Sequence, residues 1–509
     1  MNEIPDLIAE ANRHISSVRD AVARSGWKPR YHLSPQAGWM NDPNGFIHFR
    51  GKYHVFFQHC PFKPEWGPMY WGHMISPDLV HWRHLPIALA PDQEYDRDGC
   101  FSGSAIEADG KLYLMYTGNV WTGPDQAADL LQTQCLAVSE DGVRFVKLPE
   151  NPVIGATPEG DIHPFHFRDP KVWKQGDLYY CVIASRSKNE IGQALLYRSA
   201  DLKQWEFVNV MAKGGRNPGY MWECPDVFQL DGKDVLVLSP QGMKPEGYLY
   251  RNKDQSGYVL GKLDPETGMM SHGPFRLLDY GFDFYAPQTT VDAHGRRVMI
   301  AWMNMWESLM PERRHGWAGA MTLPRRLELR EDRLLVFPAR ELEALRGEGI
   351  RYENVEVRGG EEVNLPGVEG DSLELAVVLQ GRPASRFGLM LRCGEADGER
   401  TVLTYDGKEG VLELDRNASG QGPGGERQAP VALREGKLAL RVFVDRSSVE
   451  VFTEDGEVAM TARIYPGEGS VGIRFFADGG MVIRELESWA LGDCYPIGNE
   501  SNGTEETTL

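Results

Sequence analysis

The stretch NDPNGFIHFRGKYHVFFQ, residues 41–58, contains the pattern that decides the fold of this 509-residue chain. It opens on a polar residue before proline, continues as a short apolar run, turns at Arg-Gly and closes with a second apolar run. Aromatic and β-branched residues on both sides of a glycine turn are typical of two antiparallel strands. The stretch therefore predicts a β-hairpin.

The same pattern occurs four more times, with starts about 55 to 70 residues apart. The further copies are FSGSAIEADGKLYLMYTG (101–118), RDPKVWKQGDLYYCVIAS (168–185), CPDVFQLDGKDVLVLSPQG (224–242) and APQTTVDAHGRRVMIAWMN (286–304). A second motif, S-x-D-[L/G]-x-x-[W/F], occurs at residues 76–82, 139–145 and 199–205, and is typical of a turn opened by Ser and Asp side chains. Five units of about four strands predict a five-bladed β-propeller, with two β-sandwiches as the alternative.

The rest of the chain differs in composition from the repeats. Residues 4–22 carry apolar residues at helical spacing, which predicts a packing helix ending near Gly26. Twelve of the 13 tryptophans and all 13 histidines precede residue 318, whereas residues 350–490 read as alternating strands. That later part predicts an antiparallel β-sandwich, reached through a Leu-, Arg- and Glu-rich connection over 325–349.

The chain is thus expected to be all-β with one short N-terminal helix. The expected divisions are a helical segment over 1–30, a catalytic propeller over 31–335, a sandwich over 350–495 and a disordered tail over 498–509.

Charge and cysteine content exclude several kinds of partner. With 54 Lys+Arg against 73 Asp+Glu, the formal charge of -19 argues against nucleic acid or an anionic membrane as ligand. Seven scattered cysteines without a CxxC pair suggest neither a disulfide framework nor a thiolate zinc site. An acidic N-terminus and the lack of an 18-residue apolar run indicate no secretory signal and no membrane span. A cytoplasmic location is expected.

Three carboxylates stand at corresponding points of the repeats. Asp42 opens the first copy, Asp169 the third, and Glu223 directly precedes the fourth. In a propeller the innermost strand of each blade lines the central channel, so these side chains should meet at one mouth of it. Grouped carboxylates in an aromatic setting divide into a protonated acid and an ionised partner, as glycoside hydrolysis requires. Taken singly, the same residues could be a turn former, a buried ion-pair partner and a strand cap.

Aromatic residues near the same strand ends offer stacking faces for a sugar ring. They are Trp39, Trp66, Trp71, Phe101, Trp222, Trp302 and Trp306.

Four motifs in this order resemble glycoside hydrolase family 32, the β-fructofuranosidases. They are GWMNDPNG (38–45), FSGS (101–104), FRDP (167–170) and ECPD (223–226), and the likeness extends from about residue 31 to about residue 489. The resemblance implies a five-bladed propeller followed by a β-sandwich, and hydrolysis with retention at the anomeric carbon of fructose.

The resemblance also implies roles for individual residues. Asp42 would be the nucleophile, Glu223 the acid and base, and Asp169 the group that stabilises the transition state. The fructose pocket would be lined by Asn41, Gln58, Trp66, Phe101, Ser102, Arg168 and Trp306.

Several alternatives stay open at this point. The substrate could be sucrose, short fructo-oligosaccharides or sucrose-6-phosphate, with Arg313, Arg314 and His315 as a basic cluster for the phosphate. A fructosyltransferase and a noncatalytic sugar-binding propeller are the other hypotheses. The H-x-x-H of His163 and His166 is interpreted as an ordinary loop, so neither a metal nor a cofactor is expected. The sandwich could support a homo-oligomer.

Overall fold

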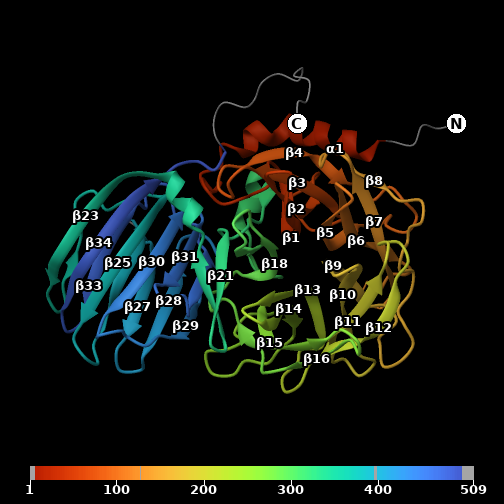
Figure 1. The fold of residues 1–509 in the computed structure, drawn as a ribbon. Helices are drawn as coiled ribbons and strands as arrows, with labels where there is room; N and C mark the ends of the chain where they lie inside the picture. The colour runs from red at the N-terminus through yellow and green to blue at the C-terminus, as the bar shows by residue number, and fades with distance from the viewer. Residues whose placement is uncertain (1–5, 127, 395–397, 496–509) are drawn as a thin grey trace.

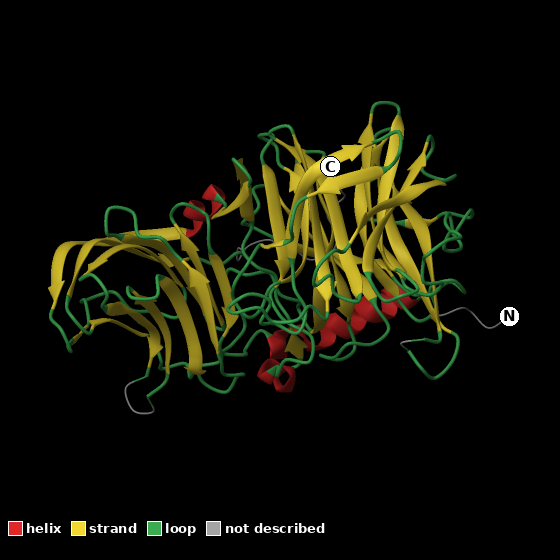
Figure 2. Ribbon diagram, turned by 90° about the horizontal axis from the view of Figure 1, so that it is seen from below, coloured by secondary structure: helices red, strands yellow, loops and turns green. Residues whose placement is uncertain are grey.

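A computed structural model describes residues 6–126, 128–394 and 398–495. The expected tail over 498–509 lies outside them. Helix α1 (Leu7–Val22) begins after Asp6, whose side chain accepts a hydrogen bond from the Ala9 amide at 3.0 Å and caps the first turn. The helix packs on strand β4 (Arg83–Leu89), along one side of the molecule (Figures 1 and 2). None of the described helices is both long and apolar enough to cross a membrane.

Strands between residues 38 and 338 form five separate sheets, and none of them closes on itself. The first contains β1 (Gly38–Phe49), β2 (Lys52–Cys60), β3 (Tyr70–Ser76), β4 and, parallel to β1, β20 (Trp317–Ala318). The second contains β5 (Cys100–Ala108), β6 (Lys111–Trp121), β7 (Leu130–Ser139) and β8 (Val146–Lys147). The third contains β9 (Phe167–Gln175), β10 (Leu178–Arg186), β11 (Gly192–Ser199) and β12 (Glu206–Lys213).

The remaining two sheets of this part follow the same order. The fourth contains β13 (Met221–Leu230), β14 (Lys233–Gln241), β15 (Gly257–Asp264), β16 (Met269–His272) and β17 (Arg276–Leu277). The fifth contains β18 (Tyr285–Val291), β19 (Arg297–Trp302), β21 (Arg325–Arg330) and β22 (Arg333–Pro338). Each of the five sequence repeats is therefore the first hairpin of one sheet.

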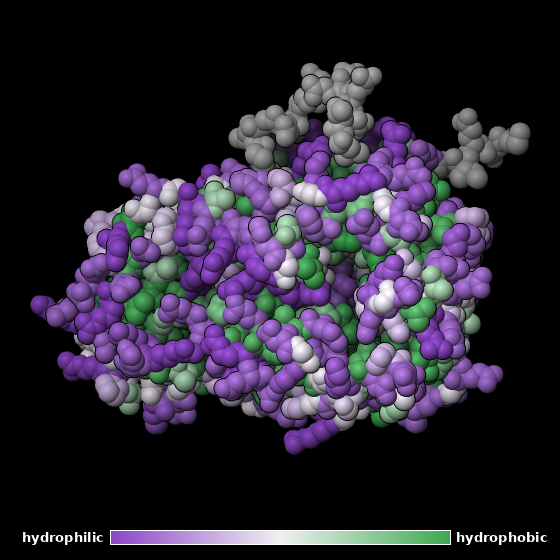
Figure 3. Space-filling model, in the orientation of Figure 1, coloured by the Kyte–Doolittle hydropathy of each residue, from purple (hydrophilic) through white to green (hydrophobic). Residues whose placement is uncertain are grey.

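The first strands of the five sheets form a ring. Strand β1 packs against β5, β5 against β9, β9 against β13, β13 against β18, and β18 against β1 (Figure 1). This arrangement differs from the two stacked sheets of a sandwich, which was the alternative interpretation of the repeats. The surface is hollowed at the centre of the ring, where hydrophilic residues are exposed (Figure 3).

Two six-stranded sheets form the C-terminal part and share one apolar core. One contains β23 (Arg346–Val357), β34 (Met481–Leu491), β25 (Leu373–Gly381), β30 (Leu438–Asp445), β31 (Ser448–Thr453) and β32 (Ala459–Arg463). The other contains β24 (Glu362–Val363), β33 (Gly472–Ala477), β26 (Arg386–Cys393), β27 (Arg400–Asp406), β28 (Val411–Ala418) and β29 (Glu426–Pro430). This is the predicted antiparallel sandwich.

The predicted connection over 325–349 is mostly sheet. Residues 325–338 supply β21, which pairs with β19, and β22, which pairs with β21. The 3-10 helix η2 (Arg340–Leu345) alone separates β22 from β23.

Candidate active site

Each first strand bulges at the corresponding point, where its pairing with the second strand loses register. The bulges include one residue from each strand at this point: Asp42, Ser102, Asp169, Cys224 and Ala286. A proline follows all of them except Ser102, and proline has no N–H to donate to a ladder. The backbone is left-handed at Asp169, Cys224 and Ala286, with φ of 63°, 47° and 51°. The bulges interrupt five ladders around one centre.

A cavity of about 350 Å³ opens there. It is lined by the ten residues to which the family resemblance gives catalytic or fructose-binding roles: Asn41, Asp42, Gln58, Trp66, Phe101, Ser102, Arg168, Asp169, Glu223 and Trp306. They come from four of the five sheets and from two loops, which explains how residues more than 250 positions apart share one wall.

Asp42 is held by neutral donors on both carboxylate oxygens. Ser102 Oγ donates to Oδ2 at 2.6 Å, and Asn41 Nδ2 donates to Oδ1 at 3.1 Å. Trp39 Nε1 in turn donates to Asn41 Oδ1 at 2.7 Å, which orients the amide. The carboxylate is therefore fixed in the cavity wall, with 8% of the residue exposed.

Asp169 is linked to Asp42 through one thiol. The Cys224 amide donates to Asp169 Oδ2 at 3.0 Å, and Cys224 Sγ lies 3.7 Å from the same oxygen. The same sulfur is 3.6 Å from Asp42 Oδ2. Two carboxylates are thus brought to either side of one sulfur atom.

Glu223 receives hydrogen bonds on both oxygens as well. Arg168 Nε and Nη2 donate to Oε1 at 3.0 and 2.6 Å. Gln241 Nε2 donates to Oε2 at 2.9 Å, and the Tyr285 hydroxyl donates to the same oxygen. Glu223 alone of the three carboxylates is bound directly to a cation.

Burial is the main cause of the unusual proton affinities in the cavity. It raises the pKa of Asp42 to about 6, with the charge of Glu223 adding to the effect and the Ser102 and Asn41 hydrogen bonds opposing it. Burial raises the pKa of Asp169 to about 7, against the opposing charge of Arg168. These two carboxyls therefore titrate at about pH 6 and about pH 7, where ordinary aspartates are fully ionised.

The aromatic residues divide into wall and core. The ring centroids of Trp66 and Phe101 are 6.0 Å apart in the cavity wall. Trp121 and Trp306 also line the cavity. The expected stacking faces of Trp39, Trp71, Trp222 and Trp302 are instead buried in hydrophobic clusters, where they support the wall.

The expected phosphate cluster does not line the cavity. The guanidinium of Arg313 lies over the Trp39 ring and that of Arg314 over Trp27, at 5.3 and 4.7 Å. His315 Nδ1 lies 2.6 Å from Ser25 Oγ. Arg313 therefore packs on a buried tryptophan behind the cavity wall, and Arg314 and His315 contact the N-terminal segment.

Nine further residues complete the wall. They are Trp121, Gln126, Leu130, Gln132, His166, Tyr220, Gln241, Lys253 and Asp254. Gln241 is the next-to-last residue of the fourth repeat and His166 belongs to the H-x-x-H, so the sequence offered a signal for these two. Tyr285, which binds Glu223, directly precedes the fifth repeat in the way that Glu223 precedes the fourth.

Among the described residues, no cluster of three or more His, Cys, Asp or Glu is placed to hold a metal ion.

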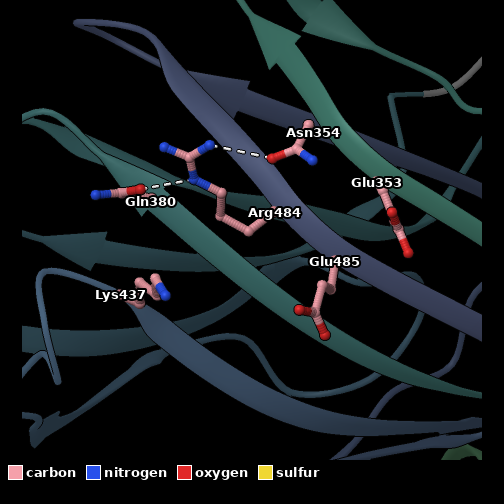
Figure 4. A pocket seen from close by; sticks show the side chains of 6 residues that line it. All are labelled: Glu353, Asn354, Gln380, Lys437, Arg484 and Glu485. Atoms are coloured by element: carbon pink, nitrogen blue, oxygen red, sulfur yellow. Dashed lines mark hydrogen bonds between the residues drawn. The ribbon is translucent and has the colours of Figure 1, made fainter.

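A second hollow, of about 380 Å³, lies on the sandwich (Figure 4). Its central cation, Arg484, is already hydrogen-bonded to Gln380 Oε1 at 2.7 Å and to Asn354 Oδ1 at 3.1 Å. It has no aromatic residue in its described lining, which consists of Glu353, Asn354, Gln380, Lys437, Arg484 and Glu485. None of the predicted site residues falls there.

Comparison with known proteins matches both parts of the chain to one family. Residues 32–338 match the family described as the N-terminal domain of glycosyl hydrolases family 32, and residues 341–490 match its C-terminal counterpart. The chain is similar to a sucrose-6-phosphate hydrolase of Escherichia coli, at 44% identity over 91% of this chain and 95% of that protein. It is also similar to a raffinose invertase of Escherichia coli, at 43% identity over 94% and 98% of the two chains.

Among solved structures, a mutant of a Bombyx mori family 32 β-fructofuranosidase in complex with sucrose is similar at a TM-score of 0.85. The two sequences are 38% identical, and the match covers 97% of this chain and 100% of that one.

Proposed function

Since the chain belongs to glycoside hydrolase family 32, we propose that it is a β-fructofuranosidase, which hydrolyses the terminal non-reducing β-D-fructofuranoside of sucrose, of sucrose-6-phosphate and of short fructo-oligosaccharides. The relatives named for sucrose-6-phosphate and raffinose and the structure with bound sucrose support this substrate class. A cavity of about 350 Å³ that combines aromatic faces with carboxylates suits one sugar unit and part of a second.

The proposed reaction is a double displacement. Asp42 attacks the anomeric carbon of fructose while Glu223 gives its proton to the departing glycosidic oxygen, so a fructosyl ester forms and the leaving sugar departs as an alcohol. Glu223 then takes a proton from water, the resulting hydroxide attacks the same carbon, and the ester bond to Asp42 breaks. Asp169 hydrogen-bonds fructose hydroxyls and stabilises the positive charge that develops on the ring.

One observation carries the proposal: three carboxylates with three different environments share one cavity. Asp42 is fixed at both oxygens by neutral donors, which suits attack from a constant position. Glu223 is 14% exposed in its side chain, so it can exchange protons with water, and Arg168 anchors it. Asp169 lies beside Asp42 across the Cys224 sulfur.

The other predicted residues are assigned to the fructose pocket. Asn41 and Ser102 bind Asp42 as well as facing the cavity. We assign Gln58, Trp66, Phe101, Arg168 and Trp306 to the same pocket. The proposed steps need no cofactor.

The ring of first strands supports a finer description of the fold. We propose that the five sheets are the blades of a five-bladed propeller, whose expected range of 31–335 extends to Pro338 at the end of β22. A separate sandwich follows, which starts at Arg346 with β23, slightly before the expected range of 350–495. The first strand of each blade then faces the axis, which is where the bulges and the cavity lie.

Turnover of sucrose by purified variants tests the assigned roles. Asp42→Ala and Glu223→Ala are each expected to lower kcat/KM at least a thousandfold, about 4 kcal/mol of transition-state stabilisation. The initial fructose should carry the starting anomeric configuration by NMR. Activity within tenfold of the parent in either folded variant would refute its role, and inverted product would refute the double displacement.

A further inference from the structure

One aromatic residue of the cavity wall, Tyr220, lies beside the proposed acid and is not used by the double displacement. It directly precedes strand β13, three residues before Glu223, and it lines the cavity. Tyr220 is 42% exposed, against 8% for Asp42 and 6% for Asp169. The two aspartates therefore lie on the floor of the cavity, and Tyr220 lies at its rim.

Two glycines allow the close packing that holds Tyr220 in place. Gly219 has a φ of 69°, and a Cβ there would lie 2.4 Å from the carbonyl oxygen of Gln241. Gly242, directly after β14, has a φ of 72°, and a Cβ there would lie 2.6 Å from Cδ1 of the Tyr220 ring. Any larger residue at either position would displace the tyrosine. One edge of the ring is thus seated on the backbone of the neighbouring strand.

The same pair of strands fixes Tyr220 relative to the acid. The Gln241 carbonyl accepts a hydrogen bond from the Tyr220 amide at 2.9 Å, while the Gln241 side-chain amide donates to Glu223 Oε2 at 2.9 Å. Burial raises the pKa of Tyr220, and the charges of Asp254 and Glu223 raise it further. Tyr220 therefore combines an exposed ring with a hydroxyl group close to the carboxylate of the acid.

The leaving sugar must extend toward this part of the wall. It is joined to the oxygen that Glu223 protonates, and the fructosyl unit lies over Asp42 on the floor. Three other aromatic residues of the wall, Trp66, Phe101 and Trp121, have ring centroids 6.0 to 6.4 Å apart and come from the first two sheets. In the ring of first strands, the fourth sheet, which carries Glu223, packs against neither of these two sheets.

We propose that Tyr220 is the platform for the leaving sugar, and that it makes the enzyme prefer fructosides with a sugar leaving group over those with a small alkyl leaving group. An aromatic ring offers an apolar face to the C–H groups of a sugar, and the phenol adds a polar end. Binding of a part of the substrate that does not react raises kcat/KM when the contact persists in the transition state. The inference rests on the proposed function, because it assumes cleavage of a bond between fructose and a second sugar.

Steady-state kinetics on sucrose and on methyl β-D-fructofuranoside test the proposal. Both substrates present the same fructosyl unit, but the second releases methanol instead of a sugar. Tyr220→Ala should lower kcat/KM for sucrose at least tenfold, and should lower the ratio of kcat/KM for sucrose to that for the methyl fructoside at least fivefold from the parent value. Because each ratio is compared with that of the parent, the intrinsic reactivities of the two substrates cancel.

Two further variants separate the ring from other properties of the tyrosine. Tyr220→Phe keeps the ring and should retain most of the parent ratio. Tyr220→Leu keeps an apolar side chain without a ring and should give the same fall as Tyr220→Ala, so it serves where the smaller residue impairs folding. Turnover of the methyl fructoside in the same preparation shows that the rest of the site is folded.

Tyr248→Ala is the matched control, because Tyr248 is a 39% exposed tyrosine between β14 and β15 of the same sheet, outside the described cavity lining. It should leave kcat/KM for both substrates unaffected. A ratio that changed less than fivefold in both Tyr220→Ala and Tyr220→Leu would overturn the inference, while hydrolysis of the two fructosides by the parent still upheld the proposed function. If the parent hydrolysed neither, the proposed function itself would fail.

Discussion

At the residue scale, burial sets the pKa of Asp42 and two hydrogen bonds oppose its effect. Burial and the charge of Glu223 raise the pKa of Asp42 to about 6, whereas the donors Ser102 and Asn41 stabilise the charged form and lower it. A nucleophile acts only when ionised. Activity on sucrose, a substrate without an ionising group, should therefore fall as the pH drops through about 6, instead of near 4 as for an ordinary aspartate.

Removing one of these donors should raise the pH below which activity falls. Ser102→Ala deletes the hydroxyl that donates to Asp42 Oδ2 at 2.6 Å, so the charged carboxylate loses stabilisation and its pKa rises. The acidic limb of log kcat/KM against pH should shift upward by roughly 1 unit.

Ser104→Ala is the matched control, because Ser104 is a buried serine of the same strand whose Oγ accepts from the Val172 amide. Its acidic limb should coincide with that of the parent. An unshifted limb in Ser102→Ala would show that another group controls the acidic side.

At the scale of elements, the S-x-D motif is the turn between the third and fourth strands of three sheets. In the third sheet, Ser199 Oγ donates to Asp201 Oδ1, and the amides of Lys203 and Gln204 donate to the same oxygen at 2.9 Å. The residue after the Asp of the motif has a left-handed backbone in all three turns, with φ of 72° at Leu79, 73° at Gly142 and 68° at Leu202. Both leucines are buried, so their packing offsets the strained backbone, and the motif therefore accepts Leu or Gly.

Removing the acceptor should weaken the turn without touching the chemistry. Asp201→Ala leaves two amides and one hydroxyl without their partner, and should lower the free energy of unfolding by about 1 kcal/mol. Asp201→Asn keeps an acceptor oxygen and should lose less. Urea unfolding measures both, with kcat on sucrose as the check on the site; equal losses in the two variants would contradict the role given to the oxygen.

The repeats allowed the elements nearest the axis to be predicted, because both strands of each hairpin are contiguous in the chain. The outer strands were harder to predict, since β21 and β22 join the fifth sheet after a long excursion and resemble a connection by composition. Helix α1 was predicted, and its start follows from the capping by Asp6.

The composition of the site was predictable for a different reason. Corresponding positions in a closed ring of sheets face one centre, so Asp42, Asp169 and Glu223 could be grouped before any distance was known. The partners Gln241 and Tyr285 were missed, because which side chain reaches a given oxygen depends on the spacing between sheets. The exposure of individual tryptophans was missed for the same reason.

At the scale of the whole molecule, a buried ionic network joins the five sheets to the sandwich. Arg325, with no exposed side-chain surface, places Nη1 2.9 Å from Asp279 Oδ2 and Nη2 2.6 Å from Glu450 Oε2. His32 continues the network, with Nε2 3.1 Å from Glu450 Oε1 and Nδ1 2.8 Å from Asp445 Oδ2. These contacts raise the pKa of His32 to about 9 despite its burial. Glu450 and Asp445 belong to the sandwich, so these two carboxylates meet Arg325 and His32 only when the two parts are docked.

The network should make the two parts unfold together. Arg325→Met replaces the guanidinium that lies over the rings of Phe284 and Phe452 by an apolar group. It leaves Asp279 buried without its cation and Glu450 with His32 alone. An uncompensated buried charge costs roughly 3 to 5 kcal/mol, so the midpoint of urea unfolding should fall strongly and activity should be lost in the same transition.

Arg333→Met is the control at the same interface, because Arg333 pairs with Glu457 of the sandwich at 2.8 Å while both side chains are substantially exposed. Solvent screening limits that pair to about 0 to 1 kcal/mol. Similar losses in the two variants would mean that burial does not set the energy of the interface. A parent enzyme that lost activity well after the sandwich had unfolded would show that the docked charges are dispensable for the site.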